Sequence, residues 1–364
     1  MNGKILVVSN TPFWGGGEAY CAKLVEMLSE RYEVGAVVAN SRLGQLLYSI
    51  SVPTWKLYAE KHAGNLRRYL YAAFNLARAI REFKPDVVHL NGQSETYFAS
   101  IPRWFQIPIT STRHTNFDDR VSRLKRFLAT RNLQIIERTV CVSSLLMRQL
   151  SNVVDEQRLI AIPNWLDSLP VPLPYGQRSP GKPFRLLYVG RIVRDKGIYD
   201  LIEAVRILDD VSLSIVGDGE ELNNAIERAH GLPIEFHGFQ ADCSIYFRDA
   251  NLLVFPSYHE GHPFVPIEAM AHGLPCLLSD IPTNRETTCD GSTAELFACG
   301  NVIDLAAKIR KLQHDEGRLS SLSMLGVELV RRNFTRDQIK KQYFNLFDEL
   351  ISEKSKGGLE CNET

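Results

Sequence analysis

The chain has 364 residues, of which 45% are hydrophobic and 23% are charged. This length is typical of two domains, and the composition allows a large core and argues against a globally disordered chain. No uninterrupted run of about 18 apolar residues occurs, so no transmembrane helix is expected. The apolar run 5–8 is too short for a signal peptide, which predicts a cytoplasmic protein.

The net charge is zero, but the charge is unevenly distributed along the chain. Residues 1–174 hold 21 Lys+Arg and 14 Asp+Glu, whereas residues 175–364 hold 21 and 28. A basic first half is suited to an anionic acceptor or membrane surface. Two domains of opposite charge that attract each other across a cleft explain the same numbers, and both interpretations stay open.

Short apolar, β-branched runs alternate with helical patterns along the chain, and continuous apolar runs predict strands buried on both faces of a parallel sheet. In the first half these strands are 4–9, 34–39, 86–90, 107–112, 138–142 and 159–162. In the second half they are 185–189, 213–216, 234–237, 252–255 and 275–278. Helical patterns at 18–29, 66–82 and 199–208 complete βαβ units. Each half is therefore predicted to form its own doubly wound, Rossmann-like α/β sheet.

The segment 167–176 separates the two halves, because its three prolines and one glycine support neither a helix nor a central strand. We predict an N-terminal domain over residues 1–170 and a C-terminal domain over 171–334, both presenting the carboxyl ends of their strands to a cleft. Apolar residues at helical spacing predict a helix over about 335–352. The polar residues 354–364 are predicted to be disordered.

The first candidate site is the glycine-rich loop after the first predicted strand. Gly16 and Gly17 allow backbone N–H groups to approach an anion at the start of the following helix. The loop lacks both the G-x-G-x-x-G fingerprint of dinucleotide-binding folds and the lysine of a P-loop. A simple tight turn explains it equally well.

The second candidate site follows the predicted strand 185–189. Arg191 stands at the end of this strand, and Lys196 follows five residues later. The planar fork of an arginine and the point charge of a lysine together suit a diphosphate. The two charges can also neutralise a diphosphate leaving group without a metal. The alternative is a solvated surface pair.

The third candidate site spans residues 256–273. Glu260 lies in a loop after a predicted strand, and Glu268 lies in a short helix that ends at Gly273. Each carboxylate can accept hydrogen bonds from the paired hydroxyls of a sugar or ribose. The N–H groups of Phe264 and Val265, near the start of the helix, can face a phosphate. The alternative for Glu268 is an ordinary exposed helix residue.

Neither the histidines nor the cysteines predict a metal site. His259 and His262 have H-x-x-H spacing, but they lie in a loop and no third ligand is evident. The seven cysteines are scattered, odd in number and without a C-x-x-C pair. This pattern favours reduced thiols over disulfides or a zinc site.

The second half carries, in order, V-G-R with K-G, V-G-D-G, H-G-F, and P-S-x-x-E-G with E-A-M-A-x-G-x-P. This ordered set resembles the retaining glycosyltransferases of the GT-B fold, in glycosyltransferase family 4, and the resemblance covers nearly the whole chain. It implies two Rossmann-like domains facing a cleft. It also implies transfer of a hexose-type sugar from a UDP- or GDP-sugar to a glycan or lipid-linked acceptor, with retention, in bacterial surface polysaccharide or lipopolysaccharide synthesis. No metal, other cofactor or nucleic acid is implied.

The resemblance also implies roles for residues by position. The implied catalytic residues are His114, Arg191, Lys196 and Glu260. The implied donor-binding residues are Gly16, Gly17, Arg191, Lys196, Gly217, Phe239, Phe264, Val265 and Glu268. Arg191 and Lys196 match the pair on the donor diphosphate, Glu268 matches the carboxylate on the ribose, and Glu260 matches the one near the transferred sugar. The chain departs from the family at His262-Pro263, where a glycine and an aromatic are frequent, and at Trp165, which replaces a glycine.

One further surface and two other functions stay open. Residues 120–138 interleave six basic residues with apolar ones, which predicts a basic amphipathic helix on an anionic membrane, or else a solvated helix face. A sugar-nucleotide 2-epimerase of the same architecture would need additional acid/base carboxylates. A binding protein without catalysis is the remaining alternative.

Overall fold

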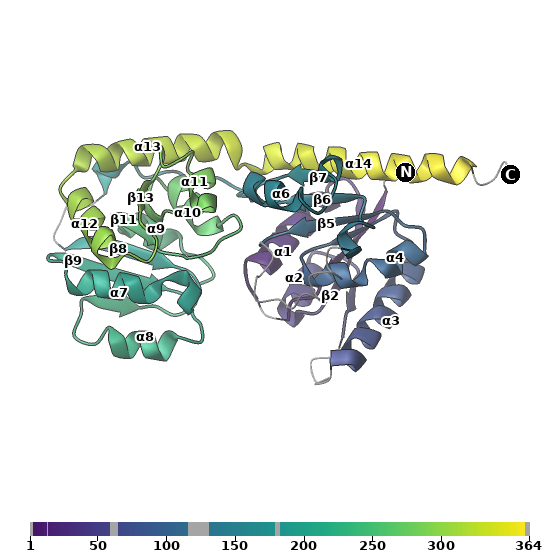
Figure 1. Cartoon of the computed structure of the whole chain (residues 1–364), viewed down its shortest axis with the longest axis horizontal. Helices are drawn as coiled ribbons and strands as arrows, with labels where there is room; N and C mark the ends of the chain where they lie inside the picture. Colours follow the sequence, from purple (N-terminus) through teal and green to yellow (C-terminus); the bar gives the residue numbers. More distant parts are fainter. Residues whose placement is uncertain (1–2, 13, 59–64, 116–130, 179–182, 361–364) are drawn as a thin grey trace. The chain divides into compact units, whose positions relative to one another are not determined.

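The computed structural model describes residues 3–12, 14–58, 65–115, 131–178 and 183–360, which form two compact units. The first unit comprises Met1–Pro163 with Asp337–Thr364, and the second comprises Asn164–Arg336. Each has its own parallel sheet with helices packed on it (Figure 1). The sequence placed the change of domain at residue 170. The structure places it at Pro163, because the proline-rich segment is hydrogen-bonded within the second unit, where the Leu173 N–H donates to the His272 carbonyl at 3.1 Å.

The N-terminal unit is built on a seven-stranded parallel sheet with the order β3-β2-β1-β4-β5-β6-β7. Its strands are β1 Lys4–Ser9, β2 Glu33–Val38, β3 Thr54–Lys56, β4 Val87–Leu90, β5 Ile109–Arg113, β6 Arg138–Cys141 and β7 Leu159–Ala161. Six of them match predicted strands to within about two residues. The sequence missed β3, because this edge strand has only three residues and none of them is fully buried.

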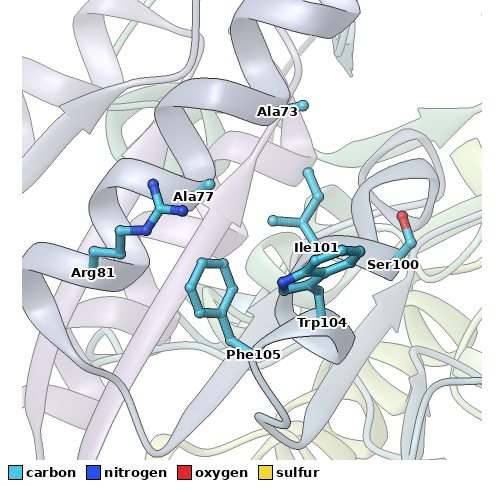
Figure 2. A pocket seen from close by; sticks show the side chains of 7 residues that line it. All are labelled: Ala73, Ala77, Arg81, Ser100, Ile101, Trp104 and Phe105. Atoms are coloured by element: carbon cyan, nitrogen blue, oxygen red, sulfur yellow. The ribbon is translucent and has the colours of Figure 1, made fainter.

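Helices cover this sheet and connect its strands. They are α1 Gly16–Ser29, α2 Ser41–Ser49, α3 Asn65–Phe83, α4 Ser100–Trp104 and α6 Ser144–Leu150, with short 3₁₀ turns η1 Ser94–Phe98 and η2 Glu156–Arg158. The helices α3 and α4 lie side by side (Figure 2). Asn40 and Ser143 begin α2 and α6 by accepting backbone N–H groups of the first turn, as N-caps do.

The last helix of the chain, α14 Arg336–Glu360, packs on the N-terminal unit. Its predicted apolar face is buried at Ile339, Tyr343, Leu346, Phe347 and Leu350. The ring of Phe347 meets that of His89 at 6.0 Å between centroids. The expectation of disorder from residue 354 onward is wrong for 354–360, which continue the helix, and Lys354 is held by Asp86 at 3.1 Å. Residues 361–364 lie outside the described part of the chain.

The C-terminal unit is built on a six-stranded parallel sheet with the order β10-β9-β8-β11-β12-β13. Its strands are β8 Phe184–Val189, β9 Val211–Val216, β10 Ile234–Phe236, β11 Leu252–Phe255, β12 Cys276–Ser279 and β13 Glu295–Phe297. Its helical elements are η3 Tyr175–Gln177, η4 Arg194–Lys196, α7 Ile198–Arg206, α8 Leu222–Arg228, α9 Ser244–Asp249, α10 Phe264–Ala271, α11 Pro282–Thr287, α12 Val302–Gln313 and α13 Glu316–Asn333. The three-residue β13 was not predicted, and the other strands were.

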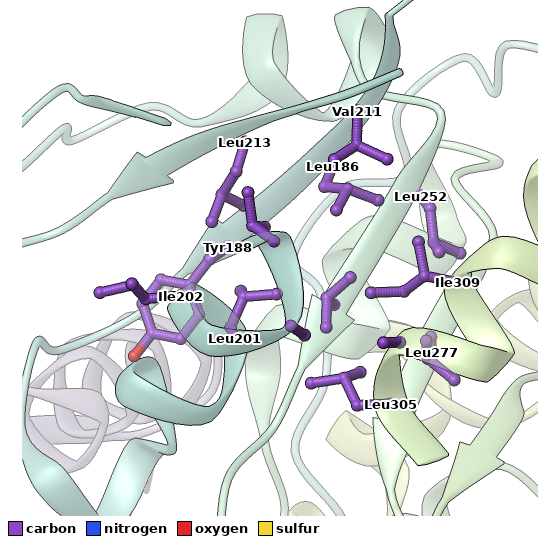
Figure 3. Packing of buried hydrophobic residues seen from close by; sticks show 14 of the residues in the cluster. Leu186, Tyr188, Leu201, Ile202, Val211, Leu213, Leu252, Leu277, Leu305 and Ile309 are labelled. Atoms are coloured by element: carbon purple, nitrogen blue, oxygen red, sulfur yellow. The ribbon is translucent and has the colours of Figure 1, made fainter. Parts of the chain in front are cut away.

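Side chains alternate across this sheet and are buried on both faces, as the continuous apolar runs predicted. On β8, Leu186 and Tyr188 join a cluster with α7 and α12, part of which is shown in Figure 3. Leu187 and Val189, from the same strand, join a second cluster with α10. Burial on both faces leaves the ends of the strands as the surface where polar side chains and backbone N–H groups can meet a ligand.

The strand order of each sheet reverses direction at one point. In the N-terminal unit this point lies between β1 and β4, and in the C-terminal unit it lies between β8 and β11. The loops that leave two such neighbouring strands diverge to opposite sides and leave a crevice at the carboxyl edge, where ligands bind in open α/β sheets. These two edges therefore determine where functional side chains are expected.

Candidate active site

In the C-terminal unit, the loops after β8 and β11 meet at the switch point and are joined by hydrogen bonds. The Tyr258 N–H donates to the Asp195 carbonyl at 2.9 Å, and the Tyr258 hydroxyl donates to Asp200 at 2.7 Å. Gly197 makes this approach possible, since its φ is +68° and a Cβ there would lie 2.1 Å from the Pro256 carbonyl oxygen. Only glycine tolerates both conditions. The loop carrying Lys196 is thereby held against the loop carrying Glu260.

Lys196 and Glu260, predicted separately from different motifs, form an ion pair across these two loops. The Lys196 Nζ contacts the Glu260 Oε1, and the two side chains are 20% and 10% exposed. Pairing offsets part of the cost of removing two charges from water. The arrangement places a cation and a carboxylate side by side at the edge where the fold binds ligands.

Arg191 lies in the loop after β8, and the buried Tyr188 holds its backbone. The Tyr188 hydroxyl donates to the Arg191 carbonyl at 2.8 Å. Burial raises the pKa of Tyr188, the charge of Glu260 raises it further, and the charge of Arg191 lowers it. Lys196 and Glu260 thus meet at the β8–β11 switch point, and Arg191 lies in the same loop as Lys196.

Glu268 lies one turn into α10, the helix that follows the Glu260 loop. This helix runs from Phe264 to Ala271, and Gly273 closes it as predicted, with a φ of +70° and an N–H that donates to the Met270 carbonyl at 2.9 Å. Glu268 is half-buried and close to Cys243, the N-cap of α9. Burial, and after it the charge of Glu268, raise the pKa of Cys243 to about 11. A role for Glu268, Phe264 or Val265 toward the donor stays a prediction.

The remaining glycine motifs close the same edge of the sheet. Gly217, at the end of β9, has a φ of +144° and donates its N–H to the Gly238 carbonyl at 2.8 Å. A Cβ on Gly217 would lie 1.9 Å from the Gly190 carbonyl oxygen, so the loops after β8 and β9 are in backbone contact. Phe239 follows Gly238 and is 52% exposed. The V-G-R, V-G-D-G, H-G-F and P-S-x-x-E-G fragments thus follow the carboxyl ends of β8, β9, β10 and β11, whereas E-A-M-A-x-G-x-P lies in α10 and leads into β12.

In the N-terminal unit, Asn91 joins two predicted site residues at the β1–β4 switch point. The Asn91 side-chain amide donates to the Gly17 carbonyl at 3.0 Å, and its Oδ1 lies 3.3 Å from the Nε2 of His114. Because the amide nitrogen already donates to Gly17, Oδ1 must accept, so Nε2 of His114 carries the proton. Burial, aided by the neighbouring Arg113, lowers the pKa of His114 to about 4. His114 is therefore a neutral imidazole at pH 7, with Nδ1 as its hydrogen-bond acceptor.

Glu95, like Asn91, is a residue at this edge that the sequence analysis missed. It is 1% exposed, and its carboxylate accepts the Asn10 N–H at 2.7 Å and the Ser94 hydroxyl at 2.9 Å. Burial raises the pKa of Glu95 to about 7, although these hydrogen bonds lower it. A Cβ on Gly92 would lie 2.7 Å from the same carboxylate. The available signal was an acidic residue in the loop that follows a buried strand, in Asn91-Gly92-Gln93-Ser94-Glu95.

We expect Glu95→Gln to change how the stability of the protein depends on pH. The folded protein binds the Glu95 proton more tightly than the unfolded chain does, so Glu95 lowers stability progressively as pH rises from about 4.5 through about 7. The glutamine side chain can accept the Asn10 N–H and donate to the Ser94 hydroxyl. Because it does not ionise, it removes this pH-dependent loss of stability. The variant should exceed the parent in stability by up to about 3 kcal/mol at pH 8 and by much less at pH 5. Thermal unfolding of both proteins across this range measures the difference, and a pH-independent difference would contradict the assignment.

Comparison with known families agrees with this geometry. The model of Glycosyltransferase Family 4 matches residues 14–168, and the model of Glycosyl transferases group 1 matches residues 175–325. The chain belongs to the family 4 glycosyltransferases. The recognition made from the ordered motifs is confirmed, and so is the predicted pair of Rossmann-like parallel-sheet domains.

Relatives and solved structures place this glycosyltransferase among GT-B proteins. The lipopolysaccharide core biosynthesis glycosyltransferase LpsD of Rhizobium meliloti is 26% identical over 356 residues, which cover 93% of this chain and 97% of LpsD. The capsular polysaccharide biosynthesis glycosyltransferase CapM of Staphylococcus aureus is 28% identical over 180 residues, 47% of each chain. HepE of Anabaena, solved with UDP and glucose, has a TM-score of 0.81 at 18% identity, over 96% of this chain and 100% of HepE. Sucrose-phosphate synthase from Thermosynechococcus elongatus has a TM-score of 0.82 at 19% identity, over 97% and 100%.

One departure of this glycosyltransferase from its family, His262, is hydrogen-bonded to Asn164, the residue that precedes the other departure, Trp165. The Asn164 N–H donates to the Nδ1 of His262 at 3.2 Å, and the Asn164 side chain donates to the His262 carbonyl. The His262 ring is buried against Phe334, and burial lowers its pKa to about 3. Trp165, next to Asn164, is fully buried. His262 therefore acts as a structural residue that fixes the start of α10, through Pro263, to the segment entering the unit.

Several features of the chain remain apart from the site. Among the described residues, no cluster of three or more His, Cys, Asp or Glu side chains is arranged to hold a metal, and the six described cysteines are free thiols. None of the described helices has the length and hydropathy of a membrane span. The predicted amphipathic segment 120–138 lies outside the described residues over 120–130. Its last residue, Arg138, begins β6 and is paired with Glu349 of α14, so the end of this segment is a strand and not a helix face.

Proposed function

We propose that this glycosyltransferase moves a hexose-type sugar from a UDP- or GDP-sugar to a glycan or lipid-linked acceptor, with retention of the anomeric configuration. The observation that carries the proposal is the ion pair of Lys196 and Glu260 at the β8–β11 switch point, with Arg191 in the same loop as Lys196. Two cations and a carboxylate at the ligand-binding edge of a Rossmann-like sheet match a molecule that is anionic at one end and rich in hydroxyls at the other.

On the donor side, Arg191 and Lys196 bind the diphosphate and stabilise the negative charge that grows on it as the sugar departs. Glu260 accepts hydrogen bonds from hydroxyls of the transferred sugar, and its pairing with Lys196 keeps both groups oriented before the donor arrives. The N–H groups of the first turn of α10, at Phe264 and Val265, face a phosphate. Glu268 holds the ribose hydroxyls. This scheme uses protein charges alone and needs no metal.

On the acceptor side, the neutral His114 and the glycine loop act together through Asn91. With its Nε2 proton committed to Asn91, His114 presents Nδ1 as an acceptor for a substrate hydroxyl. The acceptor attacks from the face that the diphosphate leaves, and a phosphate oxygen takes its proton, which retains the configuration. Closure of the two units around the substrates excludes water and limits hydrolysis of the donor.

The relatives support the biological setting. LpsD is named for lipopolysaccharide core biosynthesis and CapM for capsular polysaccharide biosynthesis, and HepE was solved with UDP, UDP-glucose, and UDP with glucose. These names favour a nucleotide sugar as donor and a bacterial surface polysaccharide or lipopolysaccharide as product. We infer a cytoplasmic enzyme that works at the inner face of the membrane, where such acceptors are carried on lipid.

The proposal predicts that a matching donor stabilises the protein and is consumed only when an acceptor is present. In a thermal-shift screen of UDP- and GDP-sugars, one base and sugar should raise the unfolding midpoint as its concentration increases. With that donor and an acceptor, the product should form with retained anomeric configuration, without added metal and in the presence of a chelator. Formation of the 2-epimer from UDP-GlcNAc without acceptor would favour the epimerase. Binding without transfer or hydrolysis would favour the binding protein.

A further inference from the structure

The outer face of α3 is apolar, although it faces away from the core. The inner face buries Ala72, Leu76, Ala79, Ile80 and Phe83. On the outer face, Leu70 is 62% exposed and Phe74 is 65% exposed. A helix that covers a sheet normally places polar side chains there. Exposed apolar side chains that are contiguous on one face, unlike isolated ones, mark an interaction surface.

The neighbouring helix α4 extends this apolar face. Trp104, the last residue of α4, is 86% exposed. Between α3 and α4 runs an open groove of about 330 Å³, lined by Ala73, Ala77 and Arg81 on one side and by Ile101, Trp104 and Phe105 on the other (Figure 2). The small alanines leave the groove shallow, so that the tryptophan ring stands at its rim. We call Leu70, Phe74, Trp104 and this groove the α3–α4 face.

The charges carried by α3, α4 and the residues at their ends are mostly positive, although Arg103 of α4 is paired with Glu137 at 3.1 Å. The segments 65–84 and 100–106, all of which the structure describes, carry six Lys or Arg and one acidic residue, Glu82. Glu82 is neutralised by Arg78 at 2.6 Å and accepts from Trp55 at 2.8 Å. Arg81 lies over the Phe105 ring at 5.4 Å from its centroid, with its apolar stem along the groove. Aromatic and leucine side chains flanked by arginines match the boundary between the headgroups and acyl chains of an anionic bilayer.

The α3–α4 face adjoins the switch-point edge of the N-terminal unit. The ring of Tyr69, in the second turn of α3, contacts those of Tyr97 and Phe98 in η1, at 6.4 and 5.9 Å between centroids. The same η1 segment carries Glu95. A membrane bound to the α3–α4 face would therefore lie near the β1–β4 edge, and a lipid-linked acceptor in that membrane could reach this edge.

We propose that the α3–α4 face docks on an anionic membrane, with Phe74, Leu70 and Trp104 inserted at the headgroup–acyl boundary and the arginines on lipid phosphates. A second copy of this chain fits this face less well. A two-fold contact would set each cluster of arginines and lysines against its own image, and like charges in contact oppose association. The proposal goes beyond the transfer reaction, and it can be tested without donor or acceptor.

The test is cosedimentation of the full chain with lipid vesicles. Binding to phosphatidylcholine vesicles that contain phosphatidylglycerol should exceed binding to pure phosphatidylcholine by at least about tenfold and weaken with salt. Phe74→Gln and Trp104→Gln should each weaken binding by about tenfold, because each withdraws one large apolar side chain from the bilayer. Ile245→Gln and Ile303→Gln, at residues 63% and 70% exposed in the C-terminal unit, are the matched controls and should bind as the parent does.

Tryptophan emission reports insertion independently. Emission should shift to the blue on anionic vesicles, and Trp104→Phe should abolish the shift while keeping most of the binding. Equal vesicle binding by the parent and by the two glutamine variants Phe74→Gln and Trp104→Gln would overturn the proposal. It would also be overturned if only substitutions of the basic residues in 120–138 reduced vesicle binding. A dimer in solution that Trp104→Gln dissociates, without vesicle binding, would overturn it in favour of self-association. Lys196→Ala should bind vesicles as the parent does, although its transfer rate is reduced. Loss of transfer and loss of vesicle binding are therefore measured separately, and failure of one proposal is distinguishable from failure of the other.

Discussion

Replacing Lys196 by Ala is expected to reduce the turnover number for sugar transfer by roughly 10²-fold or more, with a smaller loss of donor affinity. The substitution removes a positive charge from the place where the departing diphosphate develops negative charge. It also leaves the Glu260 carboxylate, only 10% exposed, without its cation beside an anionic substrate. Steady-state rates with saturating acceptor, together with donor titration by thermal shift, separate the two effects. Lys196→Arg should recover part of the rate, because it restores the positive charge, although a planar guanidinium replaces the compact ammonium group of lysine.

The control for this variant is an ion pair of similar burial away from the site. Lys308 of α12 pairs with Glu295 of β13 at 2.9 Å, and the two side chains are 31% and 15% exposed. Because Arg318 also pairs with Glu295 at 3.1 Å, Lys308→Ala should lose no more stability than Lys196→Ala and should keep a rate within about twofold of the parent. Near-native turnover of Lys196→Ala would remove Lys196 from the mechanism. An equal loss of rate in both variants would show that the effect is structural.

Replacing Gly197 by Ala is expected to cost at least about 3 kcal/mol of stability and to abolish most of the transfer activity. The new Cβ would lie 2.1 Å from the Pro256 carbonyl oxygen and 2.9 Å from its carbon, so the backbone of one loop has to move. Moving it separates the loop that carries Lys196 from the loop that carries Glu260. The melting temperature and the transfer rate of the purified variant measure the two consequences.

Gly231 provides the matched control, since its φ of +78° is similar but a Cβ there meets no atom within 4 Å. Gly231→Ala should therefore cost only about 1–2 kcal/mol, the intrinsic cost of a left-handed backbone, and leave the rate unchanged. If the two variants have the same melting temperature, close contact between the two loops does not constrain Gly197. If Gly197→Ala is destabilised but fully active, the site does not depend on that contact.

Much of the donor-side site could be predicted because its residues follow strands that are themselves easy to recognise. Arg191 and Glu260 stand at or near the ends of β8 and β11, and in a parallel sheet such ends share one edge. The N-terminal unit was harder to predict. Asn91 donates to the backbone carbonyl of Gly17, and Glu95 accepts the backbone N–H of Asn10. Every residue has a backbone carbonyl, and nearly every residue has a backbone N–H, so such partners cannot be recognised from the amino-acid types.

The sequence alone determined the fold class and the positions of the charged residues, because strand burial and glycine turns depend on the period and the type of nearby residues. Only the tertiary structure decided that Lys196 pairs with Glu260, 64 residues away. Only the fold could show that His114 is held neutral and that one face of α3 remains apolar in solvent. These properties depend on which distant groups exclude water or supply a charge at a given atom. Chain folding sets that environment, and it cannot be read from neighbours in the sequence.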